Sequence, residues 1–82
     1  MHKSNLPAHA AHLHSEIAWA LTHARLLKGL TTAEVARLAR VNVTRVRAYE
    51  RPDYFHRSVS KLAMIADALG LEIVLKEKTD AR

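Results

Sequence analysis

The sequence predicts a mainly α domain of four to five helices, followed by a short C-terminal β-strand. Three observations lead to this fold class. Apolar residues make up 49% of the chain but aromatic residues only 5%, and this Ala-, Leu- and Val-rich composition is typical of packed helices. The apolar positions recur with helical spacing. The two glycines, Gly29 and Gly70, each follow such a run, where helices commonly end on a residue with positive φ.

The first helix is expected from Ser15 to Lys28, after a His-rich segment formed by residues 1–14. Ser15 is a suitable N-cap, and residues 8–14 are compatible with a helical extension in front of it. The domain proper is therefore expected to span residues 15–70.

Two apolar stripes run along this first helix. Ile17, Leu21 and Ala24 recur at i, i+4 and i+7, which indicates the side that packs into the core. Trp19 and Leu26 lie on another side. They are either ordinary core residues, which is the simpler interpretation, or contacts for the N-terminal segment or for a partner protein.

A second helix begins at Thr31 or Thr32 and runs to about Ala39. Glu34 follows three residues after Thr31, which is the spacing of a capping box. The residues expected on its buried side are Val35, Ala36, Leu38 and Ala39.

Asn42 is expected to cap a third helix, from Val43 to about Arg51, which ends before Pro52. The turn between the second and third helices is therefore short.

Ser58 or Ser60 caps a fourth helix, which ends near Leu69. Its apolar side consists of Leu62, Ile65, Ala66 and Leu69. After Gly70 the apolar period changes to two residues, which predicts a strand over residues 71–76. Residues 77–82 form a charged tail.

The charge balance points to a polyanionic partner. The chain of 82 residues has a formal net charge of +5 and a pI near 10.1, which favours nucleic acid when the charge is clustered. The chain has no cysteine, which excludes disulfides and thiolate metal sites. No run is long enough to cross a bilayer and the N-terminus lacks the apolar core of a secretion signal, so we expect a soluble, cytoplasmic protein.

Two short helices joined by a tight turn follow the helix-turn-helix plan. The close crossing of the helices needs a small residue such as Ala36, while Val41 and Val46 are apolar where the turn and the third helix pack inward. The other side of the third helix must then face solvent, and it carries Val43, Thr44, Arg47, Ala48 and Arg51. Such a helix fits the major groove of DNA, where Arg47 can reach guanine acceptors or a phosphate.

The segment LTTAEVARLARVNVTRVRAYE resembles the helix-turn-helix of the Xre family, which includes the Cro and cI repressors of lambdoid phages. The resemblance runs from about Ile17 to Leu69 and includes ARLLKGLT and KLAMIADALGL. It implies a lambda-repressor-like DNA-binding fold and a structural ion pair between Arg25 and Glu50. The residues expected to contact DNA are Thr32, Asn42, Val43, Thr44, Arg45, Arg47, Ala48, Arg51 and Arg57.

One departure from the family lies in the turn. The family usually carries glycine where this chain has Arg40. If the backbone there has positive φ, a residue with a side chain costs about 1 kcal/mol.

The predicted strand needs a partner, because unpaired backbone groups are costly when buried and adhesive when exposed. Pairing with the same strand of a second copy predicts a homodimer held by Leu71, Ile73, Val74 and Leu75. Small antitoxins of the HipB type are similar in length and in their C-terminal strand, which forms a dimer lid. A two-fold dimer would read an inverted repeat with half-sites about 34–36 Å apart or a multiple of that.

Patterns for catalysis or metal binding are weak. The chain has no glycine-rich phosphate loop, cysteine nucleophile or paired catalytic carboxylates, so no enzymatic activity and no cofactor are expected. His9 and His12 could share a helix side, but no carboxylate or thiolate completes a metal site with them. A solvated terminal segment is the favoured interpretation of AHAAHLH.

The sequence thus predicts a homodimeric transcriptional repressor that binds double-stranded DNA at a palindromic operator. The alternative is the antitoxin of a toxin–antitoxin module, which neutralises a partner toxin and autoregulates its operon. The third alternative is a metal-responsive regulator. An adjacent toxin reading frame would favour the antitoxin.

Overall fold

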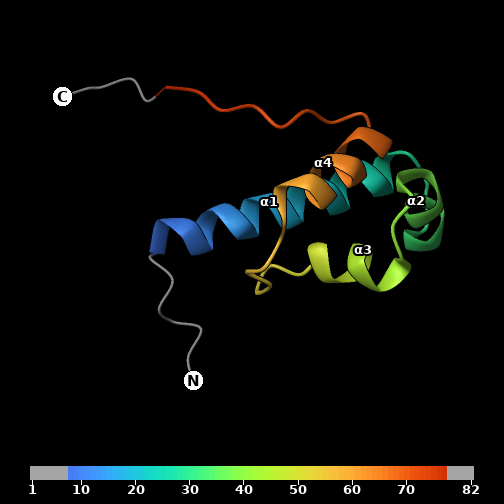
Figure 1. Ribbon diagram of the computed structural model, residues 1–82, viewed down its shortest axis with the longest axis horizontal. Helices are drawn as coiled ribbons and strands as arrows, with labels where there is room; N and C mark the ends of the chain where they lie inside the picture. Colours follow the sequence, from blue (N-terminus) through green and yellow to red (C-terminus); the bar gives the residue numbers. More distant parts are fainter. Residues whose placement is uncertain (1–7, 78–82) are drawn as a thin grey trace.

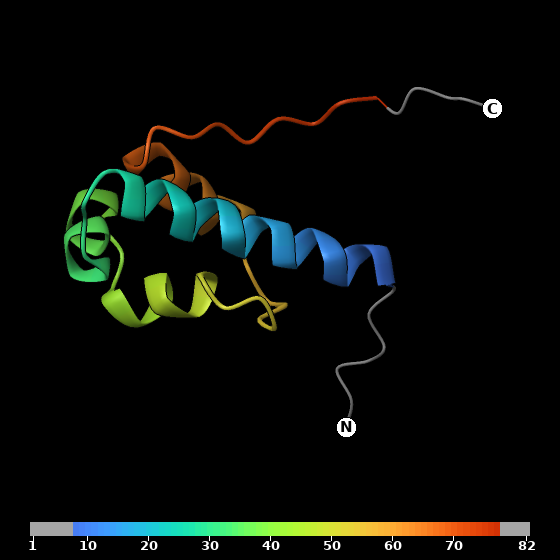
Figure 2. The same cartoon turned by 180° about the vertical axis from the view of Figure 1, so that it is seen from behind.

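The computed structural model describes residues 8–77 and confirms a mainly helical domain. Its described residues form four helices, α1 (Ala8–Leu27), α2 (Thr32–Ala39), α3 (Val43–Tyr49) and α4 (Val59–Ala68). The long helix α1 runs beside α4, α2 lies at one end, and α3 forms an edge of the molecule (Figure 1). The reverse view shows the same arrangement with α1 in front (Figure 2).

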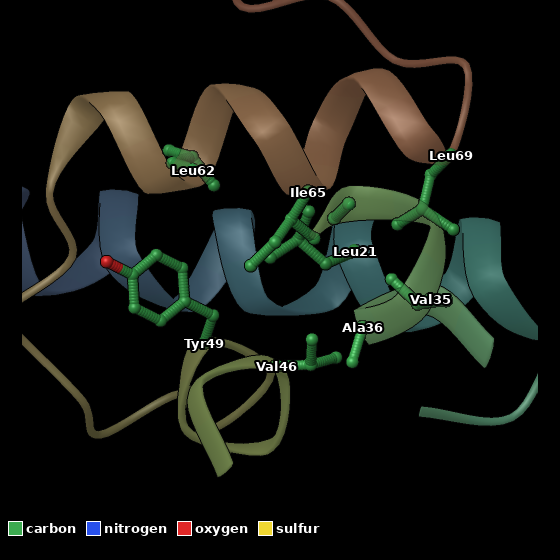
Figure 3. Close-up of a cluster of buried hydrophobic side chains, with 9 residues drawn as sticks. Leu21, Val35, Ala36, Val46, Tyr49, Leu62, Ile65 and Leu69 are labelled. Carbon is green, nitrogen blue, oxygen red and sulfur yellow. The ribbon is translucent and has the colours of Figure 1, made fainter. Parts of the chain in front are cut away.

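One hydrophobic cluster joins all four helices. It contains Leu21 of α1, three residues of α2, two of α3, and residues on and just after α4. Its members are Leu21, Val35, Ala36, Ala39, Val46, Tyr49, Leu62, Ile65 and Leu69. Figure 3 shows Val46 and Tyr49 of α3 pointing into this cluster. The side of α3 that faces the protein is therefore fixed by burial of an aliphatic and an aromatic side chain.

The beginnings of three helices are capped by side chains. Thr31 and Glu34 form the expected capping box, with distances of 3.0 Å from the Glu34 amide to Thr31 Oγ1 and 2.8 Å from the Thr31 amide to Glu34 Oε1. The hydrogen bond from the Thr31 amide holds the pKa of the Glu34 carboxyl below its usual value. Asn42 Oδ1 caps α3 and Ser58 Oγ caps α4, each accepting from the amide three residues on.

Three helix ends use one motif, in which a residue with positive φ turns the chain and the next amide donates back five residues. The φ values are 68° at Gly29, 62° at Arg40 and 74° at Gly70. The closing hydrogen bonds are Leu30 N to Arg25 O at 3.1 Å, Val41 N to Ala36 O at 3.0 Å and Leu71 N to Ala66 O at 2.8 Å. The backbone at Arg40 thus has positive φ although the residue is not glycine, which was the condition for the strain considered above.

Helix α1 differs from the expectation at both its start and its exposed side. It begins at Ala8, so residues 8–14 are helical and Ser15 lies inside the helix rather than capping it. Trp19 and Leu26 are 65% and 62% exposed, so they are not core residues. Ala18 and Leu21 are the buried residues of this helix, because the shorter helices cover only one of its sides. Leu38 of α2 is likewise exposed, although a buried place was expected for it.

The segment after α4 has no strand assigned to it in residues 71–77. Leu71 packs against the core, after which the chain runs back along the molecule toward the end where α1 begins (Figure 1). Ile73, Val74 and Leu75 are exposed. Residues 78–82, which are most of the predicted tail at 77–82, and the beginning of the N-terminal segment lie outside the described residues. Within the described chain, no helix combines the length and apolarity needed to cross a membrane.

Candidate nucleic-acid interface

Helix α3 has a sharply divided surface. Val46 is 0% and Tyr49 1% exposed, and both belong to the core cluster. Thr44 and Arg47 of α3, at i and i+3, are exposed, and so is Arg51, which lies just after the helix because α3 ends at Tyr49 and not near Arg51 as predicted. These three residues are called the outer side of α3 below. No described element lies beyond α3 at the edge of the molecule in either view (Figures 1 and 2). The outer side of α3 is therefore open to a large partner.

The remaining expected contact residues of α3 lie beside this outer side rather than on it. Val43 and Ala48 are partly buried and pack against the core, so only part of each side chain is open to solvent. Arg45 is also half-buried. Asn42 is exposed, and its side-chain oxygen accepts a hydrogen bond of 2.8 Å from the Arg45 amide. Its amide nitrogen remains available for a partner.

The ion pair between Arg25 and Glu50 is present and holds α1 to the end of α3. Arg25 Nε donates to Glu50 Oε2 at 2.7 Å and Arg25 Nη2 to Glu50 Oε1 at 3.0 Å. Arg25 Nη1 also donates to the carbonyl of Leu30 at 3.0 Å. The side chains are only 16% and 11% exposed, and the hydrogen bonds to Glu50 raise the pKa of Arg25. This bidentate geometry fixes the orientation of α3 relative to α1.

The carboxylates of the segment that spans α2 and α3 are both occupied. Glu34 caps α2, and Glu50 pairs with Arg25. The same segment carries five arginines, namely Arg37, Arg40, Arg45, Arg47 and Arg51. Since its two carboxylates serve the fold, most of this positive charge is left for solvent or for an anionic partner.

Arg57 was expected to contact DNA, but in the structure its guanidinium is engaged by other groups of the protein. Its Nη2 donates to the carbonyls of Tyr49 at 2.6 Å and of Arg51 at 2.8 Å, and its Nε also reaches the Tyr49 carbonyl, at 3.0 Å. Nη1 donates to the carbonyl of Tyr54 and lies 2.7 Å from His14 Nδ1. Burial lowers the pKa of Arg57. This guanidinium ties the chain after α3 to α1 and is not free for a phosphate.

Arg51 lies on the outer side of α3 but has a partner in the free protein. Its Nε and Nη2 donate to the two carboxylate oxygens of Asp53 at 3.2 and 3.3 Å. Both side chains are more than half exposed, so this pair is weak in water. A phosphate can replace Asp53 at little cost.

Two further basic residues, not among the expected DNA contacts, are also exposed. Arg37, near the end of α2, and Arg40, in the turn, are both exposed. The sequence feature that could have predicted their part in a basic surface is the run of arginines between positions 37 and 51, which begins before α3. Thr32, expected to contact a phosphate, is the first residue of α2 and is partly exposed.

No group of three metal-ligating side chains is assembled among residues 8–77. His12 instead lies 3.0 Å from Glu16 on the same helix.

The open residues of α2 and α3 supply hydrogen-bond donors and fixed positive charge, because guanidinium groups stay protonated in proteins. Such a surface can bind phosphates or the acceptor edges of bases, and it holds no acid–base or nucleophilic pair. Comparisons of this chain with models of protein families, with curated proteins and with solved structures found no match.

Proposed function

We propose that this protein is a sequence-specific, DNA-binding transcriptional repressor that acts as a homodimer and reads DNA with α3. The observation that carries this proposal is the division of α3, with Val46 and Tyr49 buried and Thr44, Arg47 and Arg51 exposed at the edge of the molecule. The long-range Arg25–Glu50 pair holds the helix in this orientation. A presented helix with small and basic residues is suited to the major groove.

Each residue of the proposed interface has a distinct task. Arg47 reaches base edges, because it is exposed in the middle of the outer side of α3. Thr44 is short enough to allow close approach and can contact a thymine methyl. Arg51, Arg37 and Arg40 bind backbone phosphates, which position the helix without reading sequence. The remaining expected contacts, Thr32, Asn42, Val43, Arg45 and Ala48, flank these residues.

The homodimer is proposed from the segment after α4. Ile73, Val74 and Leu75 are exposed in a single chain, and Leu75 reaches 96%. Consecutive exposed apolar residues are unfavourable in water and are covered when the segment pairs as a strand with the same segment of a second copy. A two-fold pair would present two copies of α3 to an inverted repeat.

DNA binding is tested by footprinting the protein on the DNA upstream of its own gene, followed by anisotropy titrations with the protected site. Arg47→Ala is expected to weaken binding about tenfold or more and to relax base choice, the effect of losing one good base contact. Lys28→Ala is the matched control, because Lys28 is a cation just after α1, beside Gly70 and away from α3. Equal affinity and equal selectivity of both variants would rule out α3 as the reading helix.

The dimer is tested by sedimentation with Ile73→Lys and with Glu72→Lys as its control. The first substitution places a charge among the exposed apolar residues and is expected to give monomers. The second adds positive charge next to it without removing an apolar side chain. A dimer that persists in Ile73→Lys would exclude the proposed strand pairing.

The second candidate is the antitoxin function, and one observation favours it. Trp19 and Leu26 are large, exposed and seven residues apart on α1, and exposed aromatic and aliphatic side chains are typical of protein-binding surfaces. Co-expression with the product of an adjacent reading frame tests it. Trp19→Glu is expected to abolish complex formation while leaving DNA affinity unchanged. A complex that survives Trp19→Glu and Leu26→Glu would remove this surface from the antitoxin hypothesis.

A further inference from the structure

The contact between Arg57 and His14 joins parts of the chain that are 43 residues apart. His14 lies in the second turn of α1, and Arg57 lies in the loop before α4. Arg57 Nη1 approaches His14 Nδ1 to 2.7 Å, and the His14 ring packs edge-on against Phe55 with ring centroids 5.4 Å apart. One imidazole thus connects α1 with the loop through a polar and an aromatic contact.

The polar contact requires a neutral imidazole in one tautomer. A guanidinium nitrogen can only donate, so His14 Nδ1 must accept and the ring proton must sit on Nε2. A protonated His14 would carry N–H groups on both nitrogens and would place a second positive charge against Arg57. The contact therefore changes from attractive to repulsive when the ring takes up a proton.

Among residues 8–77, the charged groups that act on His14 do not compensate that charge. The charged and titratable groups that face it from the loop are Arg57 and His56, which both disfavour a positive ring. The Arg57 guanidinium carbon also lies 5.8 Å and 5.7 Å from the ring centroids of Tyr49 and Tyr54. On its own helix, the residues three and four positions away are Ala10, Ala11, Ile17 and Ala18, none of which carries charge.

We propose that protonation of His14 is a pH switch that releases the first two turns of α1 from the loop before α4. Burial, followed by the charges of Arg57 and His56, lowers the pKa of His14. A histidine with a lowered folded pKa stabilises the docked state fully above the pKa of the free imidazole, near pH 6.5. That stabilisation is lost as the pH falls from there toward the folded pKa.

Among residues 8–77, this end of α1 is only partly covered. Ala8, His9, His12 and Leu13 are exposed, Ala10 and Ala11 are half-buried, and the first buried residue of the helix is Ala18. His12 lies 3.0 Å from Glu16 at i+4, a contact that supports the helix internally and does not tie it to the loop. Below neutral pH, α1 should therefore detach back to about Ile17 while the core cluster stays intact.

The first measurement is the tautomer and titration of His14 by NMR in the full-length protein. Near neutral pH the ring should be the Nε2–H tautomer, and its pKa should lie below that of a free imidazole, near 6.5. His56→Asn removes one of the facing groups and should raise the pKa of His14. An Nδ1–H tautomer, or a pKa equal to or above that of the free imidazole, would overturn the proposal.

The second measurement is amide hydrogen exchange across α1, corrected for the intrinsic pH dependence. Between about pH 7.5 and pH 5, opening of residues 10–16 should rise by about tenfold for each unit by which the folded pKa lies below the free value. Exchange in α4 should stay unchanged. Uniform loss of protection in both helices would mean global unfolding and would contradict a local switch.

The variant His14→Asn separates the switch from a merely structural contact. The Asn side-chain oxygen can accept from Arg57 but does not titrate in this range, so opening of α1 should become independent of pH. His9→Asn is the control and should leave the pH response unchanged. A pH response that persists in His14→Asn, or disappears in His9→Asn, would refute the assignment to His14.

Discussion

Arg25 and Arg57 can be compared with Arg37 and Arg47, because the same guanidinium group serves the molecule in two ways. Arg25 and Arg57 direct several N–H donors at Glu50 and at backbone carbonyls, and they connect α1, α3 and the loop before α4. Arg37 and Arg47 extend from α2 and α3 into solvent. We call the first two the tethering arginines and the second two the exposed arginines.

The comparison teaches that charge alone does not assign a function to an arginine. The tethering arginines act through the planar fork of donors, which an ammonium cannot reproduce. In the proposed interface the exposed arginines would act through charge and reach. Substitutions can separate these two uses, because they are expected to change the free energy of unfolding by different amounts.

Breaking the Arg25–Glu50 pair should have the largest effect. Glu50→Met leaves a guanidinium with little exposure and no counter-charge, at a cost of about 3 kcal/mol in the free energy of unfolding. Arg25→Met should cost a similar amount for the reciprocal reason. The double variant should lose less than the sum, because no unpaired charge remains. Urea unfolding of all four proteins measures this, and additive losses would show that the pair is not coupled.

Replacing Arg57 should have the next largest effect. Arg57→Lys keeps the charge, but one ammonium cannot serve the carbonyls of Tyr49, Arg51 and Tyr54 together, so a loss of about 2 kcal/mol is expected. The matched variant Arg47→Lys should stay within about 0.5 kcal/mol of the wild type. Thermal unfolding monitored by circular dichroism compares the two. Equal losses would mean that Arg57 is held only by its charge.

The sequence predicted the helices and their ends but not the contacts of Arg57, and the reason is physical. Local rules located the helices, the Thr31–Glu34 capping box and the helix ends at Gly29 and Gly70, because each depends on residues close in the chain. The resemblance supplied the pairing of Arg25 with Glu50, which spacing alone could not give. Arg57 was assigned to DNA and its contacts within the protein were not predicted, because most of its partners are backbone carbonyls of the irregular chain after α3. A sequence pattern shows no such acceptors.

The errors on apolar residues have a related origin. Periodicity shows which residues share a side of a helix but not how far the neighbouring helices cover it. Trp19, Leu26 and Leu38 were therefore placed in the core or left between two interpretations, and all three are exposed. The strand over residues 71–76 stays a prediction, because its hydrogen-bond partner would belong to another chain. Dimerisation is likewise beyond what one chain displays.

At Arg40 the backbone, and not the guanidinium, is expected to affect stability, by about 1 kcal/mol in the free energy of unfolding. This exposed residue adopts φ 62°, as Gly29 and Gly70 do at the equivalent helix ends. Arg40→Gly should therefore stabilise the protein, whereas Arg40→Ala keeps the Cβ and should change stability little. Urea unfolding decides between them. If Arg40→Ala were stabilising to the same degree, repulsion between neighbouring arginines would be the cause rather than the backbone.

The smallest effect on stability is expected for the exposed arginines themselves. Arg37→Ala and Arg47→Ala should each change the free energy of unfolding by less than about 0.5 kcal/mol, because neither side chain is needed by the core or by a cap. Their effects on DNA should nevertheless differ. Removing a phosphate contact by Arg37→Ala should lower the slope of log affinity against log salt concentration by about 0.9 and weaken all sequences alike. Removing a base contact by Arg47→Ala should weaken the operator more than other sequences, because only base contacts discriminate. If a variant lost DNA binding only to the extent that it lost stability, its arginine would be needed for the fold, as the tethering arginines are, and not for DNA contact.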